Sequence, residues 1–286
     1  MTQIPTHVEA LNHLAGIDMR YHHGRNNHEI GVSRKVLSMC IAGRFSMIAP
    51  VLIRPLYGIT QRAALTHLNS LVDLGYLSVF HTHRAIDNRL YVLTRDGAAF
   101  GSELIQYPIP FRSKATPSLQ VNHNTIAHDL MNAYVLLRGV NRVSKNGEAN
   151  PLWSGFVTER EFARLYPSHQ IRTVDGLVRE VGDKESFAAV ELENSFKSRA
   201  LRQTILEKYA YALNSGYYNK VFLFSQQRKI FDDAKRLHDD IFEMQRHAQT
   251  QSKKGASLSL SDIDRLEEGL IFRTVFCDEL QRVFYP

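Results

Sequence analysis

The sequence lacks several features that would place it in a compartment or a protein class. Its 286 residues include only two cysteines, Cys40 and Cys277, which lie far apart and form neither a zinc-binding motif nor a disulfide framework. No apolar run approaches the roughly 20 residues that a membrane-spanning helix needs. The N-terminus lacks the basic start and apolar core of a secretory signal. These absences predict a cytoplasmic protein with no membrane partner.

Basic charge is concentrated in the first part of the chain. The formal net charge is +6 and the pI is near 9.3. Residues 1–115 carry 12 lysines and arginines against 7 acids, whereas residues 116–286 carry 23 against 22. A basic N-terminal module beside a nearly neutral larger one favours a polyanionic partner such as nucleic acid. A net charge of this size also occurs in proteins that bind no polyanion.

A proline-containing segment divides the chain into two predicted domains. The stretch QYPIPFRSKATPSLQ, residues 106–120, holds three prolines and shows no periodicity, so we interpret it as a linker. We predict a flexible basic arm over residues 1–30, a first domain over 31–112 and a second domain over 113–286.

The first domain has the element order of a winged helix-turn-helix. Ser33 is a candidate N-cap for one or two helices, and Thr60 is a candidate N-cap for a helix that ends near Gly75. LSVFHTH and RLYVLT predict two short strands joined by AIDN, and RDGAAFGSELI opens a further helix. The order helix, helix, hairpin and helix predicts the winged fold.

The helix after Thr60 and the hairpin carry side chains that suit contact with double-stranded DNA. Hydrogen-bonding side chains on such a helix read base edges in the major groove, and basic residues on a wing contact phosphate or the minor groove. The candidate DNA-binding residues are Gln61, Arg62, Thr66, His67, Asn69, Arg84 and Arg89. Winged helices also serve as protein-docking modules, which leaves that alternative open.

The second domain alternates strands and helices, which predicts an α/β fold with a mixed sheet. IRTVDGLVRE and SFAAVELEN read as neighbouring strands, with VGDKE as the hairpin turn between them. A helix, a buried strand, a polar-faced helix and a closing strand are expected over residues 198–216, 217–226, 228–246 and 269–280. The expected fold class is therefore α+β and α/β.

Three carboxylates are predicted to meet at one edge of this sheet. Glu191 and Glu193 lie two residues apart on a strand and so project from one face. The hairpin brings Asp175 beside them. Carboxylates at this spacing raise each other's pKa, and a divalent cation relieves the conflict. Mg²⁺ or Mn²⁺ is the expected ion, because Mg²⁺ takes a few carboxylate oxygens together with water and phosphate.

Salt bridges are the alternative role for the two glutamates. In this interpretation they lie at an exposed strand end and pair with Arg172, Lys197 or Arg199. Glu191 and Glu193 considered alone favour salt bridges, whereas their combination with Asp175 favours the metal site.

The acid pattern resembles the PD-(D/E)xK nuclease core. VDG, with Asp175, stands for the first motif, and ELE, with Glu191 and Glu193, stands for the second. The resemblance implies a restriction-endonuclease-like mixed-sheet domain in which a bound metal ion activates water for phosphodiester cleavage.

The sequence departs from the nuclease motif at Glu193, where the motif usually has a lysine. We expect Lys197 or Lys208 to orient the water or stabilise charge in its place. Lys208 shares a helical face with Leu201, Ile205 and Ala212, so we expect it to point toward the sheet. Glu159, in TERE, is the candidate for the further acid that a helix supplies in this family.

The order of the motifs in the two domains resembles the replication–relaxation family and the related C-type mobilisation relaxases of bacterial plasmids. The similarity covers roughly residues 30–225 and rests on the order of IAHDLMNAYVLL, VDG and AVELENSFKSRALRQTILEKYAYA after a winged helix. It implies a protein that binds an origin of transfer on double-stranded DNA and nicks or relaxes it during conjugation. Other mobilisation proteins and a second copy of the chain are candidate partners.

Two further functions remain open from the sequence. One is a non-catalytic origin-binding or transcriptional regulator with a degenerate nuclease-like domain, which the missing lysine favours. The other is a restriction-type or transposition endonuclease on the same core. Relaxases with a tyrosine nucleophile typically have a metal cluster of the pattern histidine-hydrophobe-histidine. We do not expect that mechanism here, because His81-Thr82-His83 has threonine in the middle and lies on the predicted wing.

Overall fold

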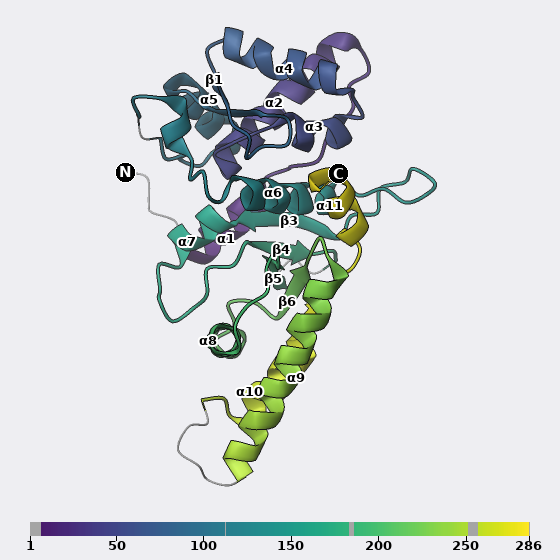
Figure 1. Ribbon diagram of the computed structural model, residues 1–286. Coiled ribbons are helices and arrows are strands. Elements are labelled where there is room, and N and C mark those ends of the chain that lie inside the picture. Colours follow the sequence, from purple (N-terminus) through teal and green to yellow (C-terminus); the bar gives the residue numbers. More distant parts are fainter. Residues whose placement is uncertain (1–6, 112, 183–185, 251–256, 286) are drawn as a thin grey trace. The chain divides into compact units, whose positions relative to one another are not determined.

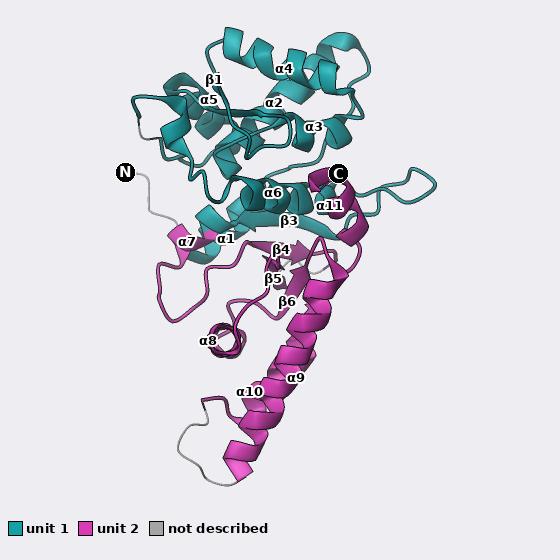
Figure 2. Cartoon of the chain, in the orientation of Figure 1, with its two compact units in different colours: residues 1–161 teal, residues 162–286 magenta. Residues whose placement is uncertain are grey.

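The protein combines helices with a mixed sheet and is an α+β protein (Figure 1). The computed structural model describes residues 7–111, 113–182, 186–250 and 257–285. The chain divides into two compact units, residues 1–161 and residues 162–286 (Figure 2). Among the described residues, no helix is both long and apolar enough to cross a bilayer.

The first unit consists mainly of helices. They are α1 (His7–Gly16), α2 (Asn27–Phe45), α3 (Pro50–Tyr57), α4 (Gln61–Asp73), α5 (Arg95–Ile105), the 3₁₀ turn η1 (Pro117–Gln120) and α6 (Ile126–Val140). Its strands are β1 (Leu77–His81), β2 (Arg89–Leu93) and β3 (Trp153–Thr158), and α7 (Glu159–Leu165) begins at its end. The predicted helices and hairpin of residues 60–105 are therefore present.

Local signals explain the hairpin and the helices beside it. The Thr60 hydroxyl caps α4 by accepting from the Ala63 N–H, and Gly75 takes the left-handed conformation at φ 77°. β1 and β2 pair in antiparallel register, and Ile48 adds a bridge by exchanging two backbone hydrogen bonds with Tyr91 at 2.9 and 3.0 Å. Ile48 thus adds one isolated bridge beside β2 and no further strand to this two-stranded sheet.

The start of α2 differs from the prediction. Asn26, and not Ser33, is the N-cap, because its side chain accepts from the Glu29 N–H at 3.0 Å. Ser33 lies inside α2, where its hydroxyl donates to the His22 carbonyl at 2.6 Å. An asparagine three residues before an acid is as good an N-cap signal as the serine.

The domain boundaries also differ from the prediction. The predicted arm over residues 1–30 contains α1 and the start of α2, while residues 1–6 lie outside the described residues. The first unit extends past residue 112 to 161, because α6 packs on α3 and on β3, and α1 packs on β3. The indole N–H of Trp153 donates to the Leu136 carbonyl at 3.1 Å, which fixes β3 to α6.

The second unit contains the predicted hairpin and mixed sheet. β4 (Gly176–Glu180) is antiparallel to β5 (Phe187–Leu192), which is parallel to β6 (Lys220–Phe224), which is parallel to β7 (Leu270–Phe272). The helices are α8 (Arg199–Asn214), α9 (Arg228–Thr250), α10 (Leu260–Gly269) and α11 (Cys277–Phe284). α10 and α11 were not predicted from the sequence, and the expected closing strand over residues 269–280 is limited to β7, because α11 begins at Cys277. Residues 183–185 of the predicted turn lie outside the described residues.

The packing of α6 against β3 depends on the close approach of Trp153 to Gly139. A Cβ atom at Gly139 would lie 1.9 Å from Cζ2 of Trp153. We expect Gly139→Ala to lower the free energy of unfolding by about 1–3 kcal/mol, the usual cost of overpacking. Urea denaturation measures this change.

Gly31→Ala is the matched control, because Gly31 is exposed within α2 and a Cβ there meets nothing within 4 Å. This variant is expected to gain up to about 1 kcal/mol, since alanine is the better helix former. Equal stability changes in the two variants would contradict the packing role of Gly139.

Candidate functional site

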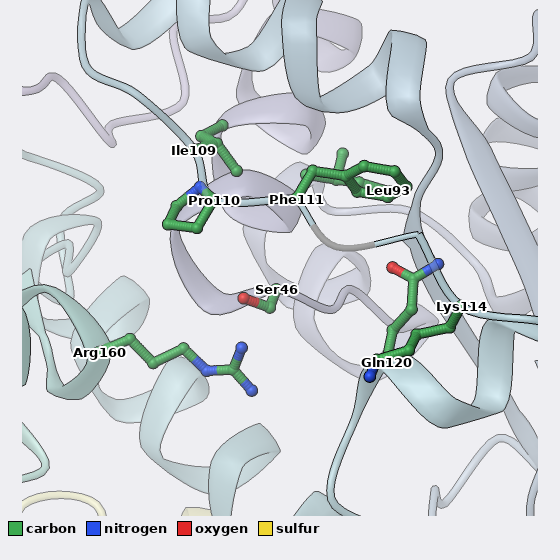
Figure 3. A pocket seen from close by; sticks show the side chains of 8 residues that line it. All are labelled: Ser46, Leu93, Ile109, Pro110, Phe111, Lys114, Gln120 and Arg160. Atoms are coloured by element: carbon green, nitrogen blue, oxygen red, sulfur yellow. The ribbon is translucent and has the colours of Figure 1, made fainter.

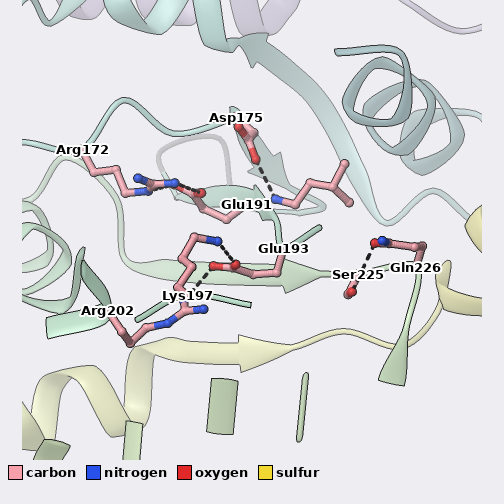
Figure 4. A network of polar contacts seen from close by, with 9 residues as sticks. Arg172, Asp175, Glu191, Glu193, Lys197, Arg202, Ser225 and Gln226 are labelled. Carbon is pink, nitrogen blue, oxygen red and sulfur yellow. Dashed lines mark hydrogen bonds and ion pairs between the residues drawn. The ribbon is translucent and has the colours of Figure 1, made fainter. Parts of the chain in front are cut away.

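The predicted acids Asp175 and Glu191 lie beside each other in the second unit. The register pairs Gly176 of β4 with Val190 of β5, which sets Asp175 across from Glu191. The Asp175 carboxylate accepts the Leu192 N–H at 2.7 Å, so it bridges the end of one strand to the other (Figure 4). The β4–β5 hairpin therefore brings the Asp175 carboxylate to the strand that carries Glu191.

Glu191 is buried and held by one arginine. The Arg172 guanidinium donates Nε–H to Oε1 at 2.7 Å and an Nη2–H to Oε2 at 2.8 Å, a bidentate pair (Figure 4). The Glu191 residue is only 1% exposed. Burial raises the pKa of Glu191 to about 7, although Arg172 acts in the opposite direction.

Glu193 is equally buried and is held by two cations. It directly follows β5 and donates its N–H to the Phe224 carbonyl at 2.7 Å, which keeps it in line with β6. Arg202 of α8 donates to Oε1 at 2.7 Å, and the Lys197 ammonium pairs with Oε2. Burial opposes ionisation, but these two cations leave the pKa of Glu193 below its ordinary value.

Two of the three cations expected in the salt-bridge alternative do pair with the glutamates, but the strand end is not exposed and the third cation is a different residue. Arg172 and Lys197 do pair with the glutamates, but the strand end is buried and not exposed. Arg199 instead donates to the Asp240 carbonyl at 2.9 Å. The third cation is Arg202, because α8 starts at its Ser198 cap and the side chain one turn later faces the sheet.

Lys208 does not have the buried position that its helical spacing suggested. It is half-buried and lines a hollow together with Arg172, Thr204 and Ile205. Leu201, which was expected on the same inward face, is 51% exposed. The inward face of α8 instead carries Arg202, which a count of apolar residues could not reveal because the buried residue is charged.

The carboxylate oxygens in this cluster do not fit a divalent ion as they are arranged. Both oxygens of Glu191 accept from Arg172, and those of Glu193 accept from Arg202 and Lys197. Across the described ranges, no three His, Cys, Asp or Glu residues are grouped so as to hold a metal ion. The Mg²⁺ or Mn²⁺ site stays a prediction.

Buried tyrosines adjoin this network. Tyr209 and Tyr218 are almost completely buried, and within the described part of the chain their hydroxyls have no hydrogen-bond partner. Burial and then the Glu191 carboxylate raise the pKa of Tyr209 well above its usual value. Both phenols therefore keep their protons at neutral pH.

A second candidate surface lies along α4 in the first unit. Arg62, Thr66 and Ser70 are exposed and follow one side of the helix at intervals of four residues. Together with Arg34 of α2 they line a shallow hollow. Two guanidinium groups and two hydroxyl groups are thus gathered on a surface that solvent reaches.

Three of the predicted DNA-binding residues on α4 are engaged inside the unit instead. The Gln61 side-chain amide donates to the Asp87 carboxylate at 2.8 Å, and the side-chain Oδ1 of Asn69 accepts from the Tyr91 hydroxyl at 2.8 Å. His67 lies 2.9 Å from the Ser38 hydroxyl, and burial lowers its pKa to about 4. His67 is therefore uncharged at neutral pH.

The hairpin presents further basic groups. Arg84, together with His81 and His83, is exposed, and Arg89 is half-buried on β2. Asp87 in the same turn accepts the Val51 N–H at 2.7 Å, so the hairpin is tied to the start of α3. This contact holds the basic turn in a fixed position relative to α3.

Glu159 begins α7 in the first unit and is half-buried. The buried acid of this segment is Glu161, which receives two hydrogen bonds from Arg44 at 2.9 and 2.7 Å. The Arg44 guanidinium also donates to the Phe156 carbonyl at 2.7 Å. Sequence reasoning missed this pair because its members lie 117 residues apart.

Comparisons with known proteins identify no relative. No family model matches the sequence, and neither the curated proteins nor the solved structures contain a match.

The Arg202–Glu193 pair gives a direct test of the buried charge network. We expect Arg202→Met to lower the free energy of unfolding by about 3–5 kcal/mol, because Glu193 loses a fully buried cation. Lys197→Met should cost less, since the Lys197 side chain is 15% exposed. Denaturant unfolding provides the measurement.

Adding Glu193→Gln to Arg202→Met should restore part of the stability, because the uncompensated charge is then removed. If the double variant is no more stable than the single one, the loss arises from packing and not from charge.

Proposed function

We propose that the chain is a double-stranded-DNA-binding protein whose first unit is a winged helix. α4 is the helix that enters the major groove, and the β1–β2 hairpin is the wing. The DNA site is an origin of transfer or an operator. Three features support this assignment: the bridge at Ile48, the Thr60 cap and the hairpin that follows α4.

The observation that carries the proposal is the exposed side of α4. Arg62, Thr66 and Ser70 present one charged and two hydroxyl groups along a helix, and Arg34 adds a second charge to the same hollow. An arginine on such a helix pairs with guanine or phosphate, and hydroxyl groups suit base edges or phosphate. Residues 1–115 also carry nearly all of the net positive charge.

In this proposal the second unit has no catalytic activity, and the protein is a regulator or origin-binding protein with a degenerate nuclease-like domain. Its glutamate oxygens are neutralised by arginine and lysine side chains, a state that resists displacement because the charges are buried. The absence of a lysine at position 193 also favours this view. The unit is then a scaffold or a partner-binding module.

Arg62 is the best single test of the DNA interface. We expect Arg62→Gln to weaken binding to the DNA that flanks its own gene by about 1–3 kcal/mol, the usual contribution of one arginine contact. Affinity is measured by fluorescence anisotropy at several salt concentrations, because a lost phosphate contact also lowers the salt dependence by about one unit.

Lys145→Gln is the control for this test, since Lys145 is an exposed cation of the first unit outside the proposed interface. It should leave affinity and salt dependence unchanged. If Arg62→Gln binds as the wild type does, α4 is not the recognition helix.

A metal-dependent nickase is the second candidate function. The observation in its favour is the position of Asp175 directly across from Glu191 at the end of the β4–β5 hairpin, the arrangement expected of the nuclease core. In this function Asp175, Glu191 and Glu193 would hold Mg²⁺ or Mn²⁺ only if Arg172 and Arg202 moved away.

Incubation with supercoiled plasmid separates the two functions. The plasmid carries the DNA that flanks the gene, and Mg²⁺ or Mn²⁺ is present or omitted. We expect binding without open-circular product, because side-chain cations occupy the carboxylates. Metal-dependent nicks made by the wild type and not by Glu191→Gln would instead establish the nickase and reject the non-catalytic proposal.

A further inference from the structure

The cavity in the first unit has an apolar wall and two cations that reach it from opposite sides (Figure 3). Its volume is about 370 Å³. Ile109 inserts between α2 and α5 against a glycine of each helix, and Pro110 and Phe111 continue the wall. The cations are Lys114 and Arg160, but Arg160 is already engaged by other groups of the chain. Among the described residues that line this cavity, a single cation is thus free for a ligand.

A wider hollow lies in the second unit, where β6 ends and α9 begins. Its volume is about 710 Å³, within the roughly 300–1,000 Å³ of small-molecule sites. Residues of α11 form its other side. Because β5, β6 and β7 are parallel, the hollow lies at the carboxyl edge of these strands, where open α/β sheets bind their ligands.

Three cations and one acid line this hollow. Arg228 and Lys229 begin α9, and Arg282 lies in the last turn of α11. All three residues are exposed, and within the described part of the chain none of their side chains forms an ion pair or a hydrogen bond. Asp278 is the one carboxylate among the described residues of the lining. The hollow therefore carries a surplus of positive charge.

The start of α9 favours an anion for two further reasons. This helix is 23 residues long and has no acidic residue in its first turn. The first N–H groups of a helix have no partner within it, and the partial positive charge of a helix N-terminus repels cations such as Arg228 and Lys229. An anion at this position would accept hydrogen bonds from the N–H groups and offset the repulsion.

A buried amide adds hydrogen-bond donors to the same hollow. Gln226 follows the end of β6, lines the hollow and is only 4% exposed. Its Oε1 accepts from the Ser225 hydroxyl at 3.4 Å (Figure 4). Its amide N–H groups have no hydrogen-bond partner among the described residues. A nearly buried donor without a partner costs free energy, and a bound anion would satisfy it.

We propose that this hollow binds a phosphate group at the start of α9. Arg228, Lys229 and Arg282 supply the positive charge, and the Gln226 amide is a further donor. Phosphate accepts charge-assisted hydrogen bonds from guanidinium and ammonium groups, and helix N-termini are ready-made sites for it. The phosphate belongs either to a small molecule or to a DNA backbone, and only the DNA form rests on the proposed function.

Isothermal titration calorimetry of the full chain with inorganic phosphate tests the small-molecule form. We expect the wild type to bind phosphate and the double variant Arg228→Gln/Arg282→Gln to bind it at least about tenfold more weakly, because charge-assisted hydrogen bonds are lost. Both arginines are exposed, so their substitution leaves the fold intact. Arg265→Gln, at an exposed arginine of α10 outside the hollow, is the matched control and should bind as the wild type does.

Fluorescence anisotropy with duplex DNA identifies the DNA form. In that form the double variant should bind DNA more weakly, with a salt dependence lowered by about two units, one for each lost phosphate contact. The same loss should appear when the double variant is combined with Arg62→Gln, because contacts at separate sites are additive. Loss of phosphate binding with unchanged DNA affinity would instead identify a small-molecule phosphate.

The proposal is overturned if the double variant matches the wild type toward both inorganic phosphate and DNA. It is also overturned if Arg265→Gln weakens binding as much as the double variant does, because general surface charge then explains the loss. The titration with inorganic phosphate does not involve α4. Unchanged DNA binding by Arg62→Gln would therefore reject the recognition helix and leave the phosphate site standing.

Discussion

Buried charge must be neutralised by an opposite charge, and this constraint shapes both units. Glu161 in the first unit and Glu191 and Glu193 in the second are almost inaccessible to water, and each carries a guanidinium partner. A carboxylate at such depth costs several kcal/mol unless it is paired and hydrogen-bonded. The segments that supply Arg44, Arg172 and Arg202 are therefore fixed relative to the strands beside them.

The same need for neutralisation explains the side chains found around the acidic cluster of Glu191 and Glu193. Acids two residues apart at a strand end suggest a cation site, and the structure supplies the cations from the chain itself. Arg202 retains one buried N–H, at Nε, with no hydrogen-bond partner in the described ranges. A buried network in which nearly all polar groups are hydrogen-bonded is costly to rearrange, so it holds β5, β6 and α8 together.

The polar residues of α4 fall into two groups, those that bond to the rest of the unit and those that are exposed to solvent. Gln61, His67 and Asn69 bond to neighbouring elements and stabilise the unit, whereas Arg62, Thr66 and Ser70 remain at the surface. The segment over residues 106–120 divides similarly. It was expected to be a linker, yet Ile109 is packed between two helices and its neighbours form a cavity wall.

The sequence by itself determined the elements with strong local signals. Thr60 and Gly75 marked the two ends of α4. The turn-forming VGDKE between two strand-like stretches predicted the β4–β5 hairpin, which brings Asp175 to the strand that carries Glu191. Arg172 and Lys197 were expected from the sequence as partners of the two glutamates, but only the tertiary structure showed that Arg44 pairs with Glu161 and Arg202 with Glu193. Arg44 lies 117 residues from Glu161, and Arg202 reaches Glu193 through the orientation of α8 on the sheet. Such pairings depend on packing between distant segments, which local propensity and spacing do not encode.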